Sequence, residues 1–513
     1  MRLARPVAAL SIAFAAACSA PGAPASTPDD TFVIGLGSEF ENLSPVLGYA
    51  ADGGSLLFDG LMERAADLSL KPALAAGPPV TSADGRTVTF TLRQGVRFHD
   101  GRPLTAKDVV YTYESVLDPT NNSPIQGDYA AIDSVKADGD STVVFSLKYP
   151  YAPLPQRTTL GIVPDGGIDP AKPVGTGPYT FVQWTPGDKI SMTANASYWG
   201  GAPAIKKVVV AFAPDDNVRS TRLAAGEFDA TVLPPKAAKR FEGQPGVTVH
   251  KQDSADYRGI MFPSKPPVTG DATIRKAFSL AVDRQAMVDS ILAGAGKPAF
   301  GPVSPDTSWY NPKVQGNATA DLPAAGKLLT DNGWKIEKDG IRVKNGQKAS
   351  FTLMYPAGDS LRKELSLAAA SDARKAGIEV ELAGLDWDAI EPRMAEDALM
   401  MGYGAPFDPD YINYDMFHSS RAGKGFFNPG HYDNPKVDAA LQRGRESADA
   451  GRKAAYEEFQ QLIRDDEAWT YLVFLKHVYV VRGAYTGIEP GVDAHEHATG
   501  GLFRDLHTWK PAS

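Results

Sequence analysis

Cysteine is almost absent from this chain, since Cys18 is the only one among 513 residues. A single thiol cannot form a disulfide within the chain, so the fold must be stabilised by its hydrophobic core. With 43% hydrophobic and 22% charged residues, the composition is that of an ordinary globular protein. The length allows two or three domains. Beyond the N-terminal region, no segment approaches the 18 consecutive apolar residues of a membrane-spanning helix.

Signatures of catalysis and of nucleic-acid binding are missing as well. The sequence has no GxSxG elbow, no Walker loop and no HExxH pair, and its eight histidines are scattered. The net charge of −9 argues against non-specific binding to nucleic acids. We therefore expect neither enzymatic activity nor a cofactor.

The N-terminal segment is basic and then apolar. Arg2 and Arg5 precede the apolar run 7–17, which is too short to cross a bilayer. This order is typical of a secretory signal peptide, which we assign to residues 1–17. The body of the protein is then expected outside the cytoplasm.

Cys18 stands at the end of this signal. Three alanines precede it, as small residues do in a bacterial lipobox, although Ala15 replaces the usual leucine. We expect lipid on Cys18 and a flexible tether over residues 18–30, which are rich in Ala, Pro, Ser and Thr. The alternative is an ordinary secretory signal followed by an unmodified cysteine.

The stretch 76–119 predicts a compact unit of two strands and a helix. Residues 87–93 alternate polar and apolar side chains, as a half-buried strand does, and residues 96–98 predict a second short strand. Thr105, three residues before Asp108, is typical of a helix N-cap. The pattern alone predicts a structural role for this unit.

Further landmarks follow along the chain. The glycines of the Gly-Thr-Gly-Pro-Tyr motif at 175–179 allow backbone geometry that other residues resist. Residues 55–61 predict a short helix, and residues 271–293 predict a longer one with an apolar face. The strand–helix–strand order over 351–382 predicts a mainly parallel sheet covered by helices.

These stretches closely resemble the family 5 solute-binding proteins of ABC importers, which include oligopeptide, dipeptide and nickel binders. The first motif of that family is matched by Leu92, Arg93, Gly95, Val96, Phe98, His99, Asp100, Gly101, Pro103, Thr105, Ala106, Asp108 and Val109. The second is matched by residues 175–179, Trp184, Asn195, Tyr198, Trp199 and Pro203. The resemblance extends over nearly all of the chain after the tether.

The resemblance implies an α/β fold of the two-lobed periplasmic-binding-protein type (type II, cluster C) with an extra middle domain. The parts that it implies are lobe I (residues 31–56, 175–262 and 478–513), the middle domain (residues 57–174) and lobe II (residues 263–477). Ligand would close the two lobes like a hinge, and no bond would be made or broken.

The loop 401–411 is the candidate ligand loop, because aromatics, two carboxylates and prolines are crowded into it. Tyr403 and Phe407 are expected to line an apolar cleft, with Asp408 and Asp410 as polar contacts. In peptide-binding members an Asp ahead of the Asp-Pro pair holds the ligand ammonium; here that position is Ala405. The local pattern is more similar to the nickel-binding branch.

Six other residues are weaker candidates. His418 and Arg421 follow the same loop, and Glu39 and Phe40 lie in a segment that borders the ligand cleft in the family. His495 and His497, two apart, are weak metal candidates, for which a solvated loop is the favoured interpretation.

We predict a lipid-anchored, monomeric binding protein that delivers small peptides to an ABC permease and ATPase. A nickel or metal-chelate binder of the same family is the alternative. Asp408 and Asp410 are also spaced for a secreted hydrolase, although Pro409 between them favours a turn. A peripheral chaperone or signalling receptor that uses the same cleft is a further alternative.

Overall fold

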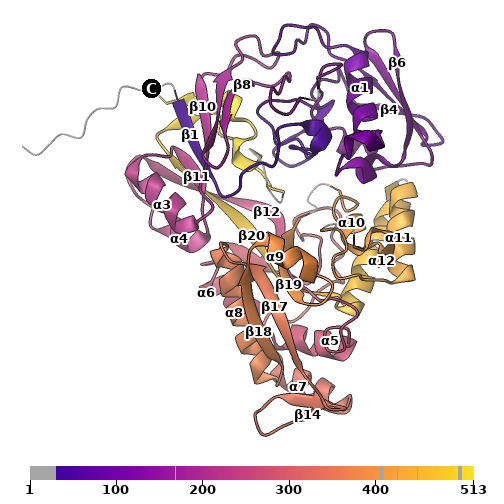
Figure 1. The fold of residues 1–513 in the computed structure, drawn as a ribbon, viewed down its shortest axis with the longest axis vertical. Coiled ribbons are helices and arrows are strands. Elements are labelled where there is room, and N and C mark those ends of the chain that lie inside the picture. The colour runs from indigo at the N-terminus through magenta and orange to yellow at the C-terminus, as the bar shows by residue number, and fades with distance from the viewer. Residues whose placement is uncertain are drawn as a thin grey trace, which may run out of the picture.

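The computed structural model describes residues 31–167, 169–404, 408–423, 426–447, 449–494 and 500–512. The predictions for Cys18, for residues 1–30 as a whole, and for Phe407, His495 and His497 fall outside these ranges. Lobe I and the middle domain lie side by side in the upper half of the molecule, and lobe II lies below them (Figure 1).

One mixed sheet of eleven strands runs through both lobes. Ten of its strands, in spatial order, are β18 (Glu379–Leu385), β17 (Ser350–Pro356), β19 (Ala398–Tyr403), β12 (Val247–Met261), β20 (Trp469–Arg482), β11 (Ala230–Val232), β1 (Thr31–Leu36), β10 (Lys207–Phe212), β9 (Lys189–Ala194) and β8 (Tyr179–Thr185). The eleventh, β13 (Gly296–Pro298), pairs with β20 beside this path.

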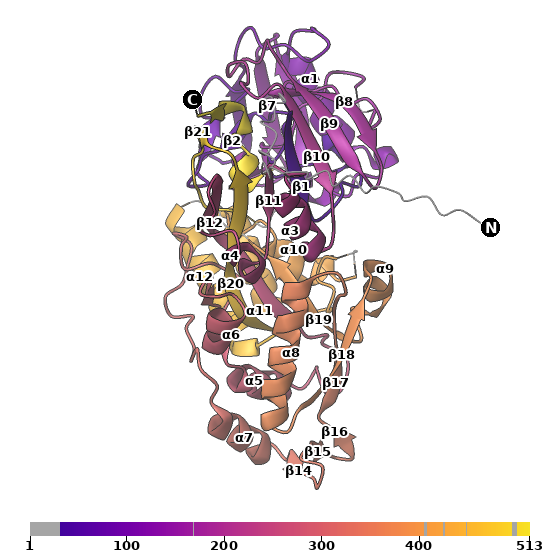
Figure 2. The ribbon, with the colours of Figure 1, turned by 90° about the vertical axis from the view of Figure 1, so that its left-hand side faces the viewer.

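The long strands β12 and β20 connect the lobes. They run antiparallel, with Val247 opposite Arg482 at the lobe I end of the pair and Met261 opposite Trp469 at the other end, next to lobe II. The register shifts between Asp253 and Tyr257, which marks a bulge where the pair passes from one lobe to the other. Figure 2 shows this pair between the upper and lower bodies of the molecule.

The expected mainly parallel sheet is wrong for the molecule as a whole. Strands β10, β1 and β11 are parallel in lobe I, and β18, β17 and β19 are parallel in lobe II. Each set is parallel because a helix crosses over between two of its strands. The centre is antiparallel because β12 and β20 carry the chain between the lobes in opposite directions.

Helices cover the sheet. They are α3 (Asp216–Ala225) and α4 (Pro235–Lys239) in lobe I, and α5 (Ala272–Ala281), α6 (Arg284–Ser290), α7 (Leu322–Asp331), α8 (Ser360–Lys375), α9 (Trp387–Ile390), α10 (Asn413–Phe417), α11 (Pro435–Glu446) and α12 (Asp449–Asp466) in lobe II. The single helix expected over 271–293 is two helices, because the Asp283 side chain accepts the Ala286 N–H and starts a new helix.

The middle domain has a four-stranded sheet and one long helix. Its elements are β2 (Met62–Arg64), β3 (Leu70–Pro72), β4 (Val80–Thr81), β5 (Thr87–Thr91), β6 (Ile132–Asp138), β7 (Thr142–Leu147), α1 (Ala106–Leu117) and α2 (Leu154–Arg157). The capping box of Thr105 and Asp108 is present. Residues 96–98 form only an isolated bridge, from Arg97 to Pro103, and not the predicted strand.

Short two- and three-stranded sheets complete the fold. They comprise β14 (Lys335–Ile336), β15 (Arg342–Lys344) and β16 (Gln347–Lys348) in lobe II, and β21 (Tyr485–Thr486) with β22 (Lys510–Pro511) in lobe I. One continuous hydrophobic core joins lobe I to the middle domain, whereas two separate cores lie in lobe II. Lobe I and the middle domain are therefore expected to move as one body.

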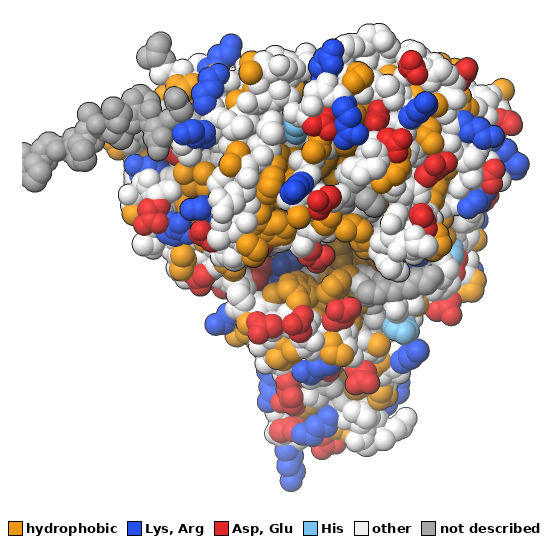
Figure 3. All heavy atoms as spheres, turned by 45° about the horizontal axis from the view of Figure 1, so that its top comes forward, with side chains coloured by type: hydrophobic (Ala, Val, Ile, Leu, Met, Phe, Trp, Pro, Cys, Tyr) orange, Lys and Arg blue, Asp and Glu red, His pale blue; other side chains and the backbone are white. Residues whose placement is uncertain are grey.

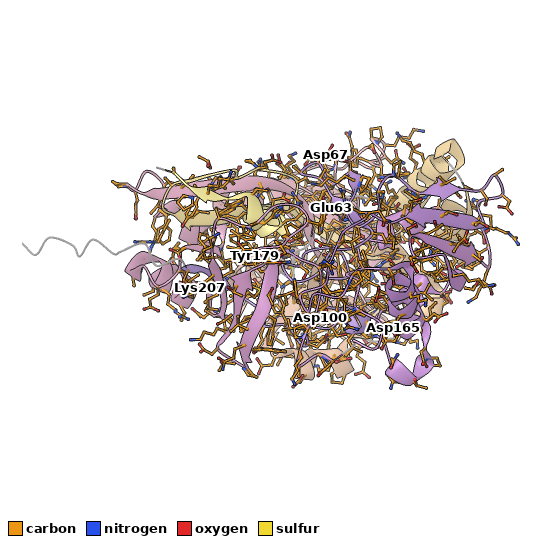
Figure 4. The ribbon with its side chains drawn as sticks, turned by 90° about the horizontal axis from the view of Figure 1, so that it is seen from above. Glu63, Asp67, Asp100, Asp165, Tyr179 and Lys207 are labelled. Carbon is orange, nitrogen blue, oxygen red and sulfur yellow. The ribbon has the colours of Figure 1, made fainter. Side chains whose placement is uncertain are left out.

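The motifs that carry the family resemblance meet in space. His99 of the first motif donates its backbone N–H to the Gly175 carbonyl (2.9 Å), and its Nε2 lies 3.0 Å from the Gly177 carbonyl. Burial lowers the pKa of His99 and keeps its ring neutral. The Gly175 N–H donates to Nδ1, so the proton on Nε2 is free to donate to Gly177. Tyr179, the last residue of the Gly-Thr-Gly-Pro-Tyr stretch in the second motif, lies near the middle of the molecule when it is seen from above (Figure 4).

Residues 55–61 run through this junction without forming the predicted helix. The Ser55 hydroxyl accepts the N–H groups of Leu57 and Phe58, at 3.0 and 3.1 Å, and holds the segment as a bend. Buried Asp59 then accepts hydrogen bonds from Thr176, Tyr198 and Trp199 of the second motif. In this segment, hydrogen bonds to side chains replace the backbone hydrogen bonds that a helix would form.

Replacing Gly177 with Ala is expected to lower the free energy of unfolding by about 2–3 kcal/mol. A Cβ at this position would lie 2.5 Å from the backbone carbonyl carbon of Leu57, which has no room to move. Urea denaturation measures the loss. Gly77→Ala is the matched control, because nothing lies within 4 Å of its Cβ position. Equal losses for both variants would contradict this explanation.

Candidate ligand-binding cleft

A cavity of about 690 Å³ lies between lobe I and lobe II. Figure 3 shows a hollow at this level, with hydrophobic side chains inside it and charged side chains of both signs around it. Leu36 and Val232, the last residues of β1 and β11, line the cavity from lobe I. Pro356 and Leu385, the last residues of β17 and β18, line it from lobe II. Ligands of open α/β sheets bind at such carboxyl ends of strands.

The floor of the cleft is built by the two connecting strands. His477 on β20 lines the cavity, and its ring lies between two carboxylates, with Nε2 3.0 Å from Asp256 and Nδ1 3.1 Å from Asp493. Burial alone would lower its pKa, but the two acceptors outweigh burial and raise the pKa of His477 to about 10. The floor therefore holds an imidazolium at neutral pH.

Contacts between the lobes close the cleft on both sides. On one side, the Ser360 hydroxyl donates to Asp216 and the Lys236 ammonium to Glu364, each at 2.5 Å. On the other side, the middle domain meets lobe II, where the Tyr151 hydroxyl donates to Asp410 at 3.2 Å. The structure is accordingly that of a closed cleft.

The predicted carboxylates Asp408 and Asp410 lie in this second contact region. Asp410 is fully buried and accepts hydrogen bonds from Arg445 Nε at 2.7 Å and from the hydroxyls of Tyr151 and Tyr456. Burial opposes its ionisation, but the nearby arginines, Arg445 first, lower the pKa of Asp410. Asp408 accepts from Arg452 at 2.6 Å. Both carboxylates are thus engaged in buried ion pairs, which supports a structural role over general acid–base chemistry.

The other predicted residues that the structure describes are not part of the cavity lining either. Tyr403 ends β19 and packs against Trp469. The His418 ring stacks on Tyr414 with centroids 4.4 Å apart, and burial lowers its pKa.

Arg421 pairs with Asp415 at 2.8 Å, against the middle domain. The Glu39 carboxylate accepts from Trp184 and from the Gly187 N–H, which fixes the loop after β1 to the β8–β9 turn. Phe40 is a core residue. The segment 36–38 just before these two residues does line the cleft.

The sequence analysis missed the charged residues that line the cleft, above all Arg258, Arg362 and His477. The sequence pattern could have revealed two of these residues as candidates. Arg258 interrupts the apolar stretch of β12, and His477 that of β20. A charged or titratable residue inside an otherwise buried strand requires a partner or a ligand.

A cavity between two lobes joined by a pair of strands defines a two-lobed binding protein, and the comparisons agree. The family model of the bacterial extracellular solute-binding proteins, family 5 middle, matches residues 69–424. Protein XP55 of Streptomyces lividans is 49% identical over 94% of this chain and 91% of its own length. NikZ from Campylobacter jejuni in complex with Ni(L-His) superposes with a TM-score of 0.87 and 28% identity over 94% of this chain and 99% of that one.

A second solved structure bears on the ligand. The oligopeptide-binding protein AppA from Bacillus subtilis, in complex with a nonapeptide, superposes with a TM-score of 0.81 at 27% identity, over 94% of this chain and 99% of that one. The chain belongs to family 5 of the bacterial extracellular solute-binding proteins, whose members are substrate-binding proteins of peptide and nickel ABC importers and not enzymes. The resemblance and the two-lobed α/β fold are confirmed.

Two features of the described residues concern membranes and metals. In these ranges no helix is both long and apolar enough to span a bilayer. No group of three or more His, Cys, Asp or Glu side chains within the same ranges is arranged to hold a metal ion.

Asp410→Asn is expected to lower the free energy of unfolding by about 3 kcal/mol, because it leaves the Arg445 charge buried without its counter-ion. The comparison is Asp331→Asn, which removes an exposed helix pair with Lys327 and is expected to cost less than about 0.5 kcal/mol. Urea midpoints measure both variants. Similar small losses would mean that the buried network does not contribute to stability.

The stabilisation provided by His477 is expected to depend on pH. Its folded pKa is raised above the unfolded value, so its contribution is complete below about pH 6.5 and is lost as the pH rises through about 10. His477→Gln should therefore destabilise the protein by about 2 kcal/mol or more at pH 6 and by progressively less toward pH 10. His250→Gln, on the neighbouring strand β12, is the control, since burial lowers the pKa of His250 and opposes its protonation. A loss for His477→Gln that is constant from pH 6 to pH 10 would contradict the assignment of an imidazolium.

Proposed function

We propose that this chain is the lipid-anchored substrate-binding protein of an ABC importer, and that it captures small peptides by hinge closure. Lipid on Cys18 would hold it at the outer face of the membrane as a monomer. The permease and ATPase subunits would accept the closed form, and the peptide would pass on unchanged. The boundaries given above for the signal peptide, the tether, the two lobes and the middle domain are part of this proposal.

The observation that carries the proposal is the cavity itself. Its volume of about 690 Å³ is in the range of small-ligand sites, and its walls belong to two lobes that only two long strands connect. A solute in this position contacts both walls only when the cleft is closed. Binding therefore shifts the population toward the closed form.

A nickel or metal-chelate ligand is the second candidate, supported by the likeness to NikZ in complex with Ni(L-His). The described residues offer no three-ligand metal cluster, and a chelate would bring metal ligands of its own. Native mass spectrometry of protein purified from its own host distinguishes the candidates by the mass that co-purifies. A peptide supports the first candidate, and a metal complex supports the second.

Closure is expected to decrease the radius of gyration in solution scattering when ligand binds. Lys236→Glu places a like charge opposite Glu364 across the cleft, so the ligand-free variant should be more open and bind ligand about threefold more weakly. Adding Glu364→Lys restores opposite charges and should restore both values. Lys207→Glu on β10 is the control for total charge. Scattering that is the same with and without ligand in every variant would contradict hinge closure.

A further inference from the structure

Lobe II contains a second cavity, of about 410 Å³, and none of the residues that line it lines the cleft. This second cavity lies where α5, α6, α7 and the C-terminal end of α12 meet the loop 300–317. Figure 2 shows α5, α6 and α7 in the lower body of the molecule. The function proposed above makes no use of this cavity.

The second cavity is basic, although the chain as a whole has a net charge of −9. The described residues of its lining include four cations and two acids, which are Lys276, Arg284, Lys313 and Arg464 against Asp465 and Glu467. Glu467 is already paired with Arg464. Lys276 and Lys313 are exposed and form no ion pair with a described residue. The excess of two positive charges attracts anions to this cavity.

The deepest cation of the second cavity is Arg284, which is only 3% exposed. Its Nε donates to the carbonyls of Ala299 and Tyr471, at 3.1 and 2.7 Å. Its Nη1 and Nη2 donate to the carbonyl and the hydroxyl of Ser279, at 2.9 and 2.8 Å. Each Nη carries two N–H groups and has one acceptor in the described part of the chain. A buried guanidinium with unused donors and no described carboxylate beside it is stabilised by an anion in the cavity.

A second guanidinium, that of Arg464, lies near the first. Burial first, and then the charge of Arg464, lowers the pKa of Arg284 to about 9. The two cations therefore repel each other. The Nε of Arg464 is buried and has no hydrogen-bond partner among the described residues. A bound anion would accept a hydrogen bond from this Nε and reduce the repulsion between the guanidinium groups.

The loop 300–317 forms a wall of the second cavity that contacts within the chain hold in place. A Cβ at Gly316 would lie 2.6 Å from the Phe300 ring and 3.2 Å from Arg464 Nη2, so glycine lets the loop approach the guanidinium. Phe300 packs against the Arg284 guanidinium, with 5.1 Å from its carbon to the ring centroid. The Asn311 side chain donates to a backbone carbonyl of α12 at 2.9 Å. The cavity is thus a fixed feature of the fold.

The size and charge of the second cavity define the class of its ligand. A volume of about 410 Å³ accommodates a small organic molecule. An anion with one negative charge would neutralise only half of the excess positive charge, whereas an anion with two or three would neutralise all of it. Arginine donors match the oxygen atoms of phosphate and carboxylate groups.

We propose that this cavity binds a small organic anion with at least two negative charges, either a phosphate monoester or a polycarboxylate. Arg284 and Arg464 bind its charged group from inside, and Lys276 and Lys313 bind it from the solvent side. The anion links α12 to α5 and to the loop 300–317, so its binding stabilises lobe II. The site is separate from the cleft and does not depend on the solute that the cleft takes.

The test uses the full chain and four probes, which are glycerol phosphate, citrate, inorganic phosphate and acetate. Calorimetry measures their affinities at a constant ionic strength of about 0.15 M, because salt screens exposed charges. Glycerol phosphate or citrate is expected to bind at one site, at least about tenfold more tightly than acetate, because its larger charge interacts with more of the cations. The same probe should raise the melting temperature.

Paired lysine variants locate the effect. Lys276→Gln combined with Lys313→Gln removes the two exposed cations and should weaken binding about tenfold, since an exposed charge contributes about threefold. Lys335→Gln combined with Lys338→Gln is the matched control. It changes the net charge equally, at two exposed positions outside the cavity lining, and should leave the affinity unchanged.

A third double variant tests the buried side of the second cavity. Arg464→Gln combined with Glu467→Gln removes an ion pair as a whole, so neither charge is left without its partner. It should weaken binding by more than about tenfold, because the anion loses its buried donor. Urea midpoints show whether this variant folds, and the lysine variants alone decide the test if it does not.

Hydrogen exchange shows where the probe binds, since a bound anion should protect residues 313–317 and 461–467. Binding of phosphate compounds alone would assign a phosphate ligand, and binding of citrate alone would assign a polycarboxylate. The inference is overturned if no probe binds more tightly than acetate, or if the Lys276 and Lys313 variant binds as tightly as its control. Either result leaves peptide capture standing, because the second cavity shares no residue with the cleft.

Discussion

The antiparallel pairing of β12 and β20 is the interaction on which the rest of this structure depends. These strands join a body made of lobe I and the middle domain, which share one core, to a lobe with cores of its own. Backbone hydrogen bonds keep the pair in register at both ends, and the bulge after Asp253 interrupts it at the level of the cleft. A ladder that is continuous at its ends and broken in the middle can bend there without unfolding either lobe. The cavity lies directly at this position.

Charge is used in two ways around the hinge. Where the middle domain meets lobe II, Asp408 and Asp410 form buried ion pairs with arginines, and Asp410 also accepts from the Tyr151 hydroxyl, so these groups support the closed arrangement. In the cleft, by contrast, Arg258 and Arg362 are held only in part. His477 fixes the floor between two carboxylates.

Local patterns predicted much of the fold. The strand β5 and the capped helix α1 follow from alternation and from Thr105. The residues of the cleft could not be predicted in this way, because they come from strand ends and helix starts that are far apart in the sequence. The composition of the loop 401–411 predicted that it binds the ligand. Its two carboxylates pair instead with arginines on α11 and α12, and no local pattern in the sequence predicts these pairs. Arg258 could have been found, because a charge inside a buried strand needs an acceptor.

The central claim is that a small solute is held between the lobes on top of the β12–β20 pair. The most direct measurement is a crystal structure of the protein purified from its own host, without added ligand. The account predicts electron density for a small molecule inside the cavity, touching lobe II at Arg362 and lobe I at the end of β1. A closed molecule with only water in this cavity, or a solute bound elsewhere on the chain, would contradict it.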